Sequence, residues 1–340
     1  MTTTTGTPGA AKGAGSIPRD PDRNLALELV RATEAAAMAC AAQRGRGDKI
    51  AVDQAAVDAM RPVLGSVGMR GVVVIGEGEK DEAPMLFNGE EVGDGTGPEV
   101  DIAVDPVDGT TAAAKGLPDA VAVVGLAERG TMFDPGPCVY MHKVVVPPAA
   151  AGVVDLDAPV ADQLAAVASA LGRGTGELTV AVLDRPRHED LVREVLATGA
   201  RVRFLLDGDV AGSIMVAQPD LGVDVLMGVG GTPEGVIAAC ALRCLGGEML
   251  GRLHARDEGE RRAALDAGYD LDRVLTTRDL VSGDDVFFAA TGVTDGTLLD
   301  GVRSVGGRIV TSSLSMRSRS GAVRLVQTRH DPDRSNLVLR

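Results

Sequence analysis

The sequence predicts a mixed α/β fold, in which short strands and helices alternate along most of the chain. Hydrophobic residues make up 45% and charged residues 24% of the 340 residues, which is ordinary for a folded, soluble protein with a large core. Short apolar runs alternate with stretches of helical periodicity, the pattern of a layered α/β fold. Four of the apolar runs end in acidic residues, and α/β sheets form ligand sites beyond the carboxyl ends of their strands.

The chain begins with a segment that we expect to lack a fixed structure. Residues 1–23 are predicted to be a disordered tail, because their start (MTTTTGTPGAAKGAGS) is of low complexity. The same stretch lacks the apolar core of a signal peptide. The folded domain is expected over residues 24–340. An amphipathic helix is predicted from Asn24 to Gln43, and GRGD (45–48) ends it. A second helix is predicted from about Asp53, which is a preferred N-cap residue.

Strands and helices then follow in alternation. Strands are predicted at residues 71–76, 101–105, 120–126, 139–146, 178–183, 202–206, 223–229 and 286–291, and in the tail from Val302, with a turn at 318–321. Helices are predicted at residues 160–171, 188–198, 210–217, 233–245 and 258–267. A break into two subdomains is expected near residues 160–175.

Composition and charge exclude several classes of partner. The net charge of −14 repels nucleic-acid phosphates and anionic lipid, so neither is an expected partner. No apolar run approaches the roughly 18–20 residues of a membrane span. The four cysteines are scattered and lie in apolar surroundings, which is typical of buried thiols in a reducing compartment. These features together predict a cytoplasmic protein.

The stretch DIAVDPVDGT shows why acidic strand ends need an explanation. Asp105 and Asp108 follow an apolar strand three residues apart. Asp, Pro and Gly all favour turns, so one such site has a purely local interpretation. The same pattern recurs, however, after three other apolar runs. The acidic residues there are Glu77, Glu79, Asp81 and Glu82 after the first, Asp207 and Asp209 after another, and Glu234 after the last.

A cluster of these carboxylates would have to be held together by cations. Two carboxylates about 4 Å apart repel each other by about 4 kcal/mol at an effective dielectric constant near 20. Oxygen ligands without Cys or His favour the hard ions Mg²⁺ or Mn²⁺. Such ions often bind substrate phosphates, which suggests phosphoryl chemistry. The local alternative for Glu234 is a helix start, because Thr232-Pro233-Glu234 supplies a cap, a first-turn proline and a first-turn acid.

Basic residues at another strand end could hold a second phosphate. DRPRHED contributes Arg185, Arg187 and His188 directly before a predicted helix, although a solvated basic turn is the alternative. Tyr140 and Lys143 are either functional or surface residues of a strand. GVGG (228–231) lacks the spacing of a dinucleotide-binding loop, but its glycines permit close approach of the backbone to a ligand.

These motifs resemble a known family. DPVDGT is similar to the DPxDGT motif of the lithium-sensitive, metal-dependent phosphatases of sugars and inositol. With GRGDKIAVD, IGEGEKDEAPML, RPRH, DGD and GVGGTPEG in this order, the chain from about Asn24 onward resembles the bacterial class II fructose-1,6-bisphosphatases. The resemblance implies a layered αβαβα fold with two subdomains, and a homodimer or homotetramer. It also implies two or more Mg²⁺ or Mn²⁺ ions in each site.

The resemblance also implies roles for individual residues. The implied metal ligands are Asp53, Glu77, Asp105, Asp108 and Glu234. The implied catalytic residues are Glu77, Asp81 and Thr110, with either a water on the metal or the Thr110 hydroxyl as nucleophile. The implied substrate-binding residues are Asp108, Gly109, Thr110, Tyr140, Arg185, Pro186, Arg187, Asp207, Gly208, Asp209 and Gly231. Two positions depart from relatives: Asp108 replaces a Glu of some, and Arg185 replaces a common Lys.

The resemblance predicts hydrolysis of the 1-phosphate of fructose 1,6-bisphosphate, a sugar bisphosphate, to fructose 6-phosphate in gluconeogenesis. Alternatives are sedoheptulose-1,7-bisphosphatase or inositol monophosphatase activity, or a sensor of divalent ions or sugar phosphates without catalysis. The basic RPRH stretch favours a substrate with a second phosphate. The local alternative for Thr110 is that its hydroxyl only caps the helix that TTAAAKG begins.

Overall fold

The computed structural model describes residues 25–78, 85–335 and 337. The helices are α1 (Ala26–Gln43), α2 (Lys49–Gly65), α3 (Thr110–Lys115), α4 (Val160–Ala170), α5 (Glu189–Ala197), α6 (Val210–Val216), α7 (Thr232–Leu245), α8 (Glu258–Asp266) and α9 (Thr277–Leu280). The strands are β1 (Arg70–Ile75), β2 (Glu91–Val92), β3 (Glu99–Asp108), β4 (Val121–Glu128), β5 (Tyr140–Val146), β6 (Thr179–Leu183), β7 (Arg201–Leu205), β8 (Val225–Gly231), β9 (Glu248–Leu253), β10 (Leu275–Thr276), β11 (Phe287–Gly292), β12 (Arg303–Val305), β13 (Arg308–Arg317) and β14 (Ala322–His330).

Within the described residues the strands form two mixed sheets. The first has the order β12-β13-β11-β4-β3-β1-β2, with β14 paired to β13, and the second has the order β10-β9-β5-β8-β6-β7. In the first sheet β1 and β3 are parallel, whereas β3 and β4 are antiparallel. In the second sheet β6 runs parallel to both β7 and β8, whereas β5 runs antiparallel to β8. The predicted mixed α/β fold class is confirmed.

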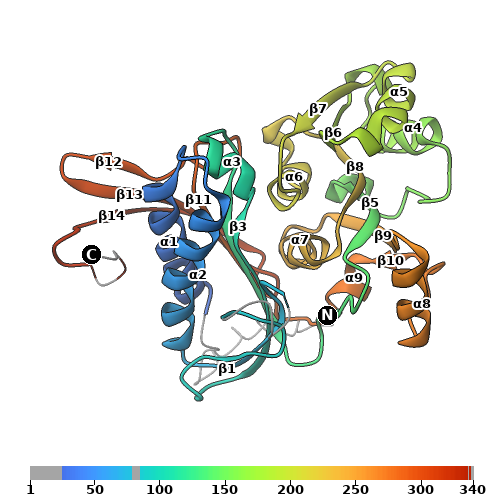
Figure 1. The fold of residues 1–340 in the computed structure, drawn as a ribbon. Coiled ribbons are helices and arrows are strands. Elements are labelled where there is room, and N and C mark those ends of the chain that lie inside the picture. The colour runs from blue at the N-terminus through green and yellow to red at the C-terminus, as the bar shows by residue number, and fades with distance from the viewer. Residues whose placement is uncertain (1–24, 79–84, 336, 338–340) are drawn as a thin grey trace, which may run out of the picture.

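Helices lie on both sides of each sheet and between the sheets, as Figure 1 shows. Helices α1 and α2 share one hydrophobic core with the first sheet, whereas α4 and α5 share another with the second sheet. Helices α6 and α7 belong to a third core that takes residues from both sheets, so they form the middle layer. The layers therefore follow the order helix, sheet, helix, sheet, helix.

The start of α2 differs from the prediction. Asp53 is not an N-cap, because the helix begins one turn earlier, at Lys49. Asp48 is the cap, and its side chain accepts a hydrogen bond from the Ala51 amide at 3.0 Å. Both positions hold an aspartate, so capping preference alone could not choose between them. The longer helix places Asp53 in its second turn and frees the Asp53 carboxylate for other partners.

Other boundaries differ by only a few residues, but some short elements were not predicted. Strand β9 is the longest of these. It was not predicted because its sequence EMLGRL alternates weakly and contains two charged residues. It completes the second sheet beside β5. The short strands β2 and β10 and the one-turn helix α9 also lacked a signal in the sequence.

Three expectations about organisation have different outcomes. The predicted disordered tail at residues 1–23 lies outside the described residues. The expected subdomain break near residues 160–175 stays a prediction; the chain leaves the first sheet after β4, enters the second at β5 and returns at β11. Among the helices of the described chain, none is long and apolar enough to cross a membrane.

Candidate functional site

The two carboxylates of DPVDGT lie at a distortion of strand β3. The pairing of β3 with β4 shifts between Asp105 and Asp108, so the strand bulges at Pro106 and Val107. Asp105 accepts a hydrogen bond from the Val107 amide at 2.8 Å, which closes a local turn of the kind proposed for a purely structural aspartate. Asp108 is buried, with 2% of its surface exposed. The local interpretation therefore holds for one oxygen of Asp105 and not for Asp108.

A cavity of about 410 Å³ brings the acidic strand ends together. It lies where β1, β3 and helices α2, α3 and α7 meet. The acidic residues that line it are Asp53, Glu77, Asp105, Asp108, Asp207 and Glu234, and Gly109 and Thr110 line it as well. All five residues predicted as metal ligands therefore face one cavity, although they come from distant parts of the sequence.

The electrostatics of this cavity disfavour the ionised carboxylates. Burial, followed by the charges of Asp53 and Glu234, raises the pKa of Glu77 to about 7. Burial likewise raises the pKa of Asp105 and of Asp108, and neighbouring carboxylates add to both shifts. A cluster of like charges in a partly dry cavity would be stabilised by a bound cation.

The chemistry of this donor set fits a hard cation. The ligand atoms would all be carboxylate oxygens, and one of them, Oε2 of Glu234, is buried without a hydrogen-bond partner in the described part of the chain. Across the described ranges, however, no three acidic, cysteine or histidine side chains stand close enough to hold an ion jointly. Binding of an ion would therefore require the carboxylates to move closer together, and the charge of the ion would offset their mutual repulsion.

Thr110 contacts the acidic cavity through its hydroxyl group. The Oγ1 atom donates to Oδ1 of Asp53 at 2.8 Å, and it also lies 3.1 Å from the Val107 carbonyl. The N-cap of α3 is Gly109, with no side-chain cap, so the Thr110 hydroxyl does not cap the helix. Gly109 has φ +94°, and a Cβ atom there would lie 3.2 Å from Cα of Ala120. Only glycine fits this turn without strain, and the turn aims Thr110 at the carboxylates.

A second cavity, of about 350 Å³, adjoins the first and contains the predicted basic residues. The two cavities share Asp207, Gly208, Pro233 and Glu234. The second is also lined by Tyr140, Arg185, Arg187, Asp209, Gly231 and Arg256. One compartment is therefore acidic and the other holds three guanidinium groups, an arrangement that suits a ligand with two phosphates.

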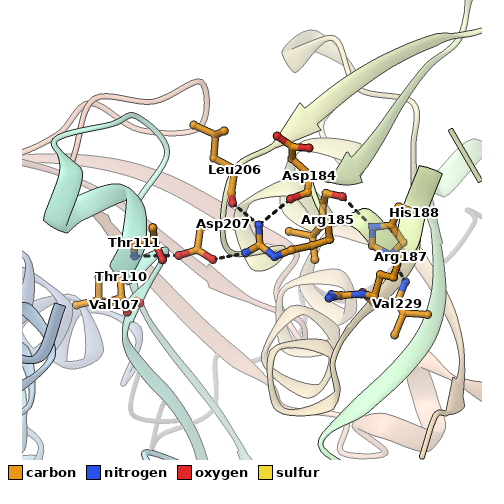
Figure 2. Close-up of polar contacts among 11 residues, drawn as sticks. Val107, Thr110, Thr111, Asp184, Arg185, Arg187, His188, Leu206, Asp207 and Val229 are labelled. Atoms are coloured by element: carbon orange, nitrogen blue, oxygen red, sulfur yellow. Dashed lines mark hydrogen bonds and ion pairs between the residues drawn. The ribbon is translucent and has the colours of Figure 1, made fainter. Parts of the chain in front are cut away.

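Asp207 connects the two compartments. Its Oδ1 accepts from Nη2 of Arg185 at 2.8 Å, and its Oδ2 accepts from the Thr111 amide at 2.9 Å (Figure 2). Arg185 also donates to the carbonyls of Leu206 and Asp184. This chain of contacts fixes the start of α3, and with it Thr110, relative to Arg185. Asp207 therefore acts as a spacer between the compartments.

Arg187 is held differently from Arg185. Its Nε and Nη2 donate to the Val229 carbonyl at 3.0 and 2.7 Å, and its guanidinium lies 5.4 Å from the centre of the Tyr140 ring. No carboxylate forms an ion pair with Arg187 in the described part of the chain. Pro186 lines neither cavity; it begins the single turn that carries Arg187 and His188.

His188 supports this turn from behind. The Val229 amide donates to Nε2 at 2.9 Å, so Nε2 carries no hydrogen and Nδ1 donates to the Leu183 carbonyl at 2.8 Å (Figure 2). The ring thus connects β6 to β8 in its neutral form. Burial is the main reason that the pKa of His188 is lowered from its ordinary value. His188 is a structural residue of the site and not a phosphate ligand.

Lys143 is the residue whose role the sequence left most open. The surface interpretation is wrong, because Lys143 is 1% exposed. Its ammonium group forms an ion pair with Asp209 at 2.8 Å and donates to the Gly231 carbonyl at 2.9 Å. Lys143 therefore pairs with Oδ2 of Asp209, whereas Oδ1 is buried without a hydrogen-bond partner among the described residues, and the expected substrate-binding role of Asp209 stays a prediction. The sequence contained a signal for this burial, because Lys143 lies on the same face of β5 as the apolar residues Met141 and Val145.

The two adjoining cavities bring together most of the residues that the sequence singled out, and Glu79 and Glu82 lie outside the described residues. Asp81, expected to assist the attacking water, lies outside the described residues. Arg256 was not singled out, because it lies in a short loop between β9 and α8 and no motif includes it. The assigned roles of the individual residues stay predictions.

Comparisons with known proteins agree with these observations. The family model described as bacterial fructose-1,6-bisphosphatase, glpX-encoded, matches residues 23–330. The chain is similar to fructose-1,6-bisphosphatase 1 class 2 of Escherichia coli (strain K12), with 45% identity over 327 residues, covering 92% of this chain and 97% of the relative. Fructose-1,6-bisphosphatases class 2 of Escherichia coli O6:H1 and of Shigella flexneri match with the same identity and coverage.

Proposed function

The chain belongs to the family of bacterial fructose-1,6-bisphosphatases, and we propose that it removes the 1-phosphate of fructose 1,6-bisphosphate, which gives fructose 6-phosphate and inorganic phosphate. It is a phosphoric monoester hydrolase. The single observation that supports the arrangement of the substrate is the pair of adjoining cavities, one lined by carboxylates and the other by arginines. The reacting phosphate would lie in the acidic cavity, and the distal 6-phosphate would lie beside Arg187.

The family is metal-dependent in general, and we propose that Mg²⁺ or Mn²⁺ binds between the carboxylates of the acidic cavity. The residues that would hold two or more such ions are Asp53, Glu77, Asp105, Asp108 and Glu234. When bound, the ions would neutralise the phosphate oxygens and the leaving alkoxide. The raised pKa values of these carboxylates support this proposal, because a bound cation would favour their ionised forms and so offset the shifts that burial and neighbouring carboxylates cause.

The residues of the chain itself would orient the reacting groups. The Thr110 hydroxyl donates to Asp53, so Asp53 is placed to accept its proton or to fix its direction during attack on phosphorus. The Asp207 bridge fixes Thr110 relative to Arg185, which precedes the turn that carries Arg187, and would in this way help to set the distance between the two phosphate positions. A rigid spacing of this kind favours bisphosphates of one length.

Three further features are proposed on family membership alone. We expect the reaction to serve gluconeogenesis, the protein to act in the cytoplasm, and the chain to form a homodimer or homotetramer. The two alternative phosphatase activities and the non-catalytic sensor are not favoured by the comparisons.

The experiment that tests the proposal is a phosphate-release assay with purified, full-length protein. Fructose 1,6-bisphosphate, sedoheptulose 1,7-bisphosphate and inositol monophosphate are compared with Mg²⁺ or Mn²⁺ and after chelation with EDTA. We expect fructose 1,6-bisphosphate to have the highest kcat/KM, chelation to abolish turnover and added metal to restore it. Full activity after removal of metal would contradict the metal proposal. A higher kcat/KM for inositol monophosphate would contradict the proposal that fructose 1,6-bisphosphate is the substrate.

A further inference from the structure

Arg256 lines the basic cavity although no motif predicted it. It lies three residues after β9, and the neighbouring His254 amide donates to the Tyr140 carbonyl at 2.9 Å. The Arg256 amide and its Nε both donate to Oε2 of Glu260, at 2.6 and 3.2 Å. Backbone and side chain are therefore both anchored beside β5.

Glu260 is well suited to fix Arg256. Its side chain is only 6% exposed, and its other oxygen accepts from the Val139 amide at 3.3 Å. Asp257 caps α8 by accepting from the Glu260 amide at 2.9 Å, which fixes the helix turn that carries Glu260. Three donors thus share the charge of Glu260, and the two terminal nitrogens of Arg256 form no hydrogen bond with the described residues.

Tyr140 lies beside both Arg256 and Arg187, and all three residues line the basic cavity. The two guanidinium carbons lie 5.8 and 5.4 Å from the centre of its ring. Two cations beside one aromatic ring attract the ring but repel each other. An anion bound in the cavity that both arginines line would offset that repulsion.

The charges around the cavity show which cations remain for a ligand. Arg185 forms an ion pair with Asp207, and Lys143 forms one with Asp209. Arg187 donates to a carbonyl group, and the ion pair of Arg256 with Glu260 uses only Nε of the guanidinium, so its two terminal nitrogens have no hydrogen-bond partner among the described residues. Arg187 and Arg256 are therefore the two guanidiniums best placed to bind a phosphate dianion, whose oxygens match their N–H groups.

We infer that Arg256 binds the distal phosphate of the sugar bisphosphate together with Arg187, and that it determines selectivity for bisphosphates over monophosphates. The inference rests on the proposed function. The alternative is an exposed ion pair of Arg256 with Glu260, of a kind that contributes only about 0–1 kcal/mol to stability. That alternative predicts no effect on the substrate.

The test is the variant Arg256→Gln, which keeps a polar side chain as far as the position of Nε and removes the charge and the two terminal nitrogens. We expect KM for fructose 1,6-bisphosphate to rise ~10-fold, with kcat within about twofold, because a charged hydrogen bond at a partly exposed position is lost. The KM or inhibition constant for fructose 1-phosphate, which lacks the distal phosphate, should not change. By calorimetry, the Kd for fructose 6-phosphate should rise by a similar factor.

Arg262→Gln is the matched control, because Arg262 lies exposed on the adjacent helix α8 and lines neither cavity. Its kinetic constants should equal those of the wild type. An Arg256→Gln enzyme with unchanged KM for the bisphosphate, or with equal effects on both substrates, would overturn the inference. A wild-type enzyme that releases no phosphate from fructose 1,6-bisphosphate would instead refute the proposed function, so the two failures are distinguishable.

Discussion

The buried ion pair of Lys143 and Asp209 gives the strongest prediction about stability. The side chains are 1% and 3% exposed, and at 2.8 Å their attraction is about 6 kcal/mol for an effective dielectric constant near 20. Loss of water by both groups offsets most of that attraction. Replacing Lys143 by Met would leave Asp209 buried without its counter-ion, and breaking a buried pair in this way costs about 3–5 kcal/mol.

This cost can be converted into a melting temperature. The entropy of unfolding is roughly 2.1 cal/mol/K per residue, so for the 340-residue chain each kcal/mol of lost stability lowers Tm by about 1.4 °C. Lys143→Met should therefore lower Tm by about 4–7 °C in metal-free buffer, as measured by calorimetry. Lys115→Met, at an exposed position, is the control, and its Tm should stay within about 1 °C of the wild type.

The double variant Lys143→Met/Asp209→Asn separates charge from packing. Because it removes the uncompensated carboxylate, it should be more stable than Lys143→Met alone, with a coupling energy that a double-mutant cycle reports. The reasoning is refuted if the Tm of Lys143→Met equals that of the control variant, or if the double variant has no higher Tm than Lys143→Met. In the second case the loss would come from packing of the Lys143 side chain.

The remaining predictions concern the two cavities and the histidine behind them. Thr110→Ala should lower kcat by ~10²-fold or more while Thr110→Ser keeps much of it, because only Ser retains a hydroxyl for Asp53; normal turnover with a lower Tm would show a purely structural role. Arg187→Ala should raise KM for fructose 1,6-bisphosphate far more than it lowers kcat, and an unchanged KM in a folded protein would contradict phosphate binding there. The pKa of His188 is lowered from 6.5, so the unfolded chain takes up the proton first and stability is lost as pH falls below about 6.5. The Tm difference between wild type and His188→Gln should therefore shrink from pH 7.5 to pH 5, and a constant difference would rule out this linkage.

The sequence determined most of the order of strands and helices, because hydrophobic periodicity is a local property, although β2, β9, β10 and α9 lacked a clear signal. Each strand that ends in acidic residues was visible as an apolar run followed by Asp or Glu, and DPVDGT was visible as a strand end. Local chemistry was less reliable at boundaries. Asp48 and Asp53 are equally good caps, and only the completed first turn of α2 decides between them.

The tertiary structure alone decided which of these residues meet. Asp53 and Thr110 are 57 residues apart, and their hydrogen bond depends on how α2 packs beside β3 and α3. Sheet order has no signature in the sequence, because it is set by the packing of whole layers. The same holds for Arg256, which reaches the basic cavity because β9 pairs with β5.

Burial of charge was also decided by the fold. Lys143 shares a face of an apolar strand with Met141 and Val145, which indicates burial, but the sequence could not show what covers that face or which carboxylate pairs with the lysine. Helix α7 packs against this face, so the lysine needs a counter-ion, and Asp209 from the start of α6 supplies one. A charge can be buried only where its partner is buried with it, and a partner 66 residues away is brought there by packing and not by any local pattern in the chain.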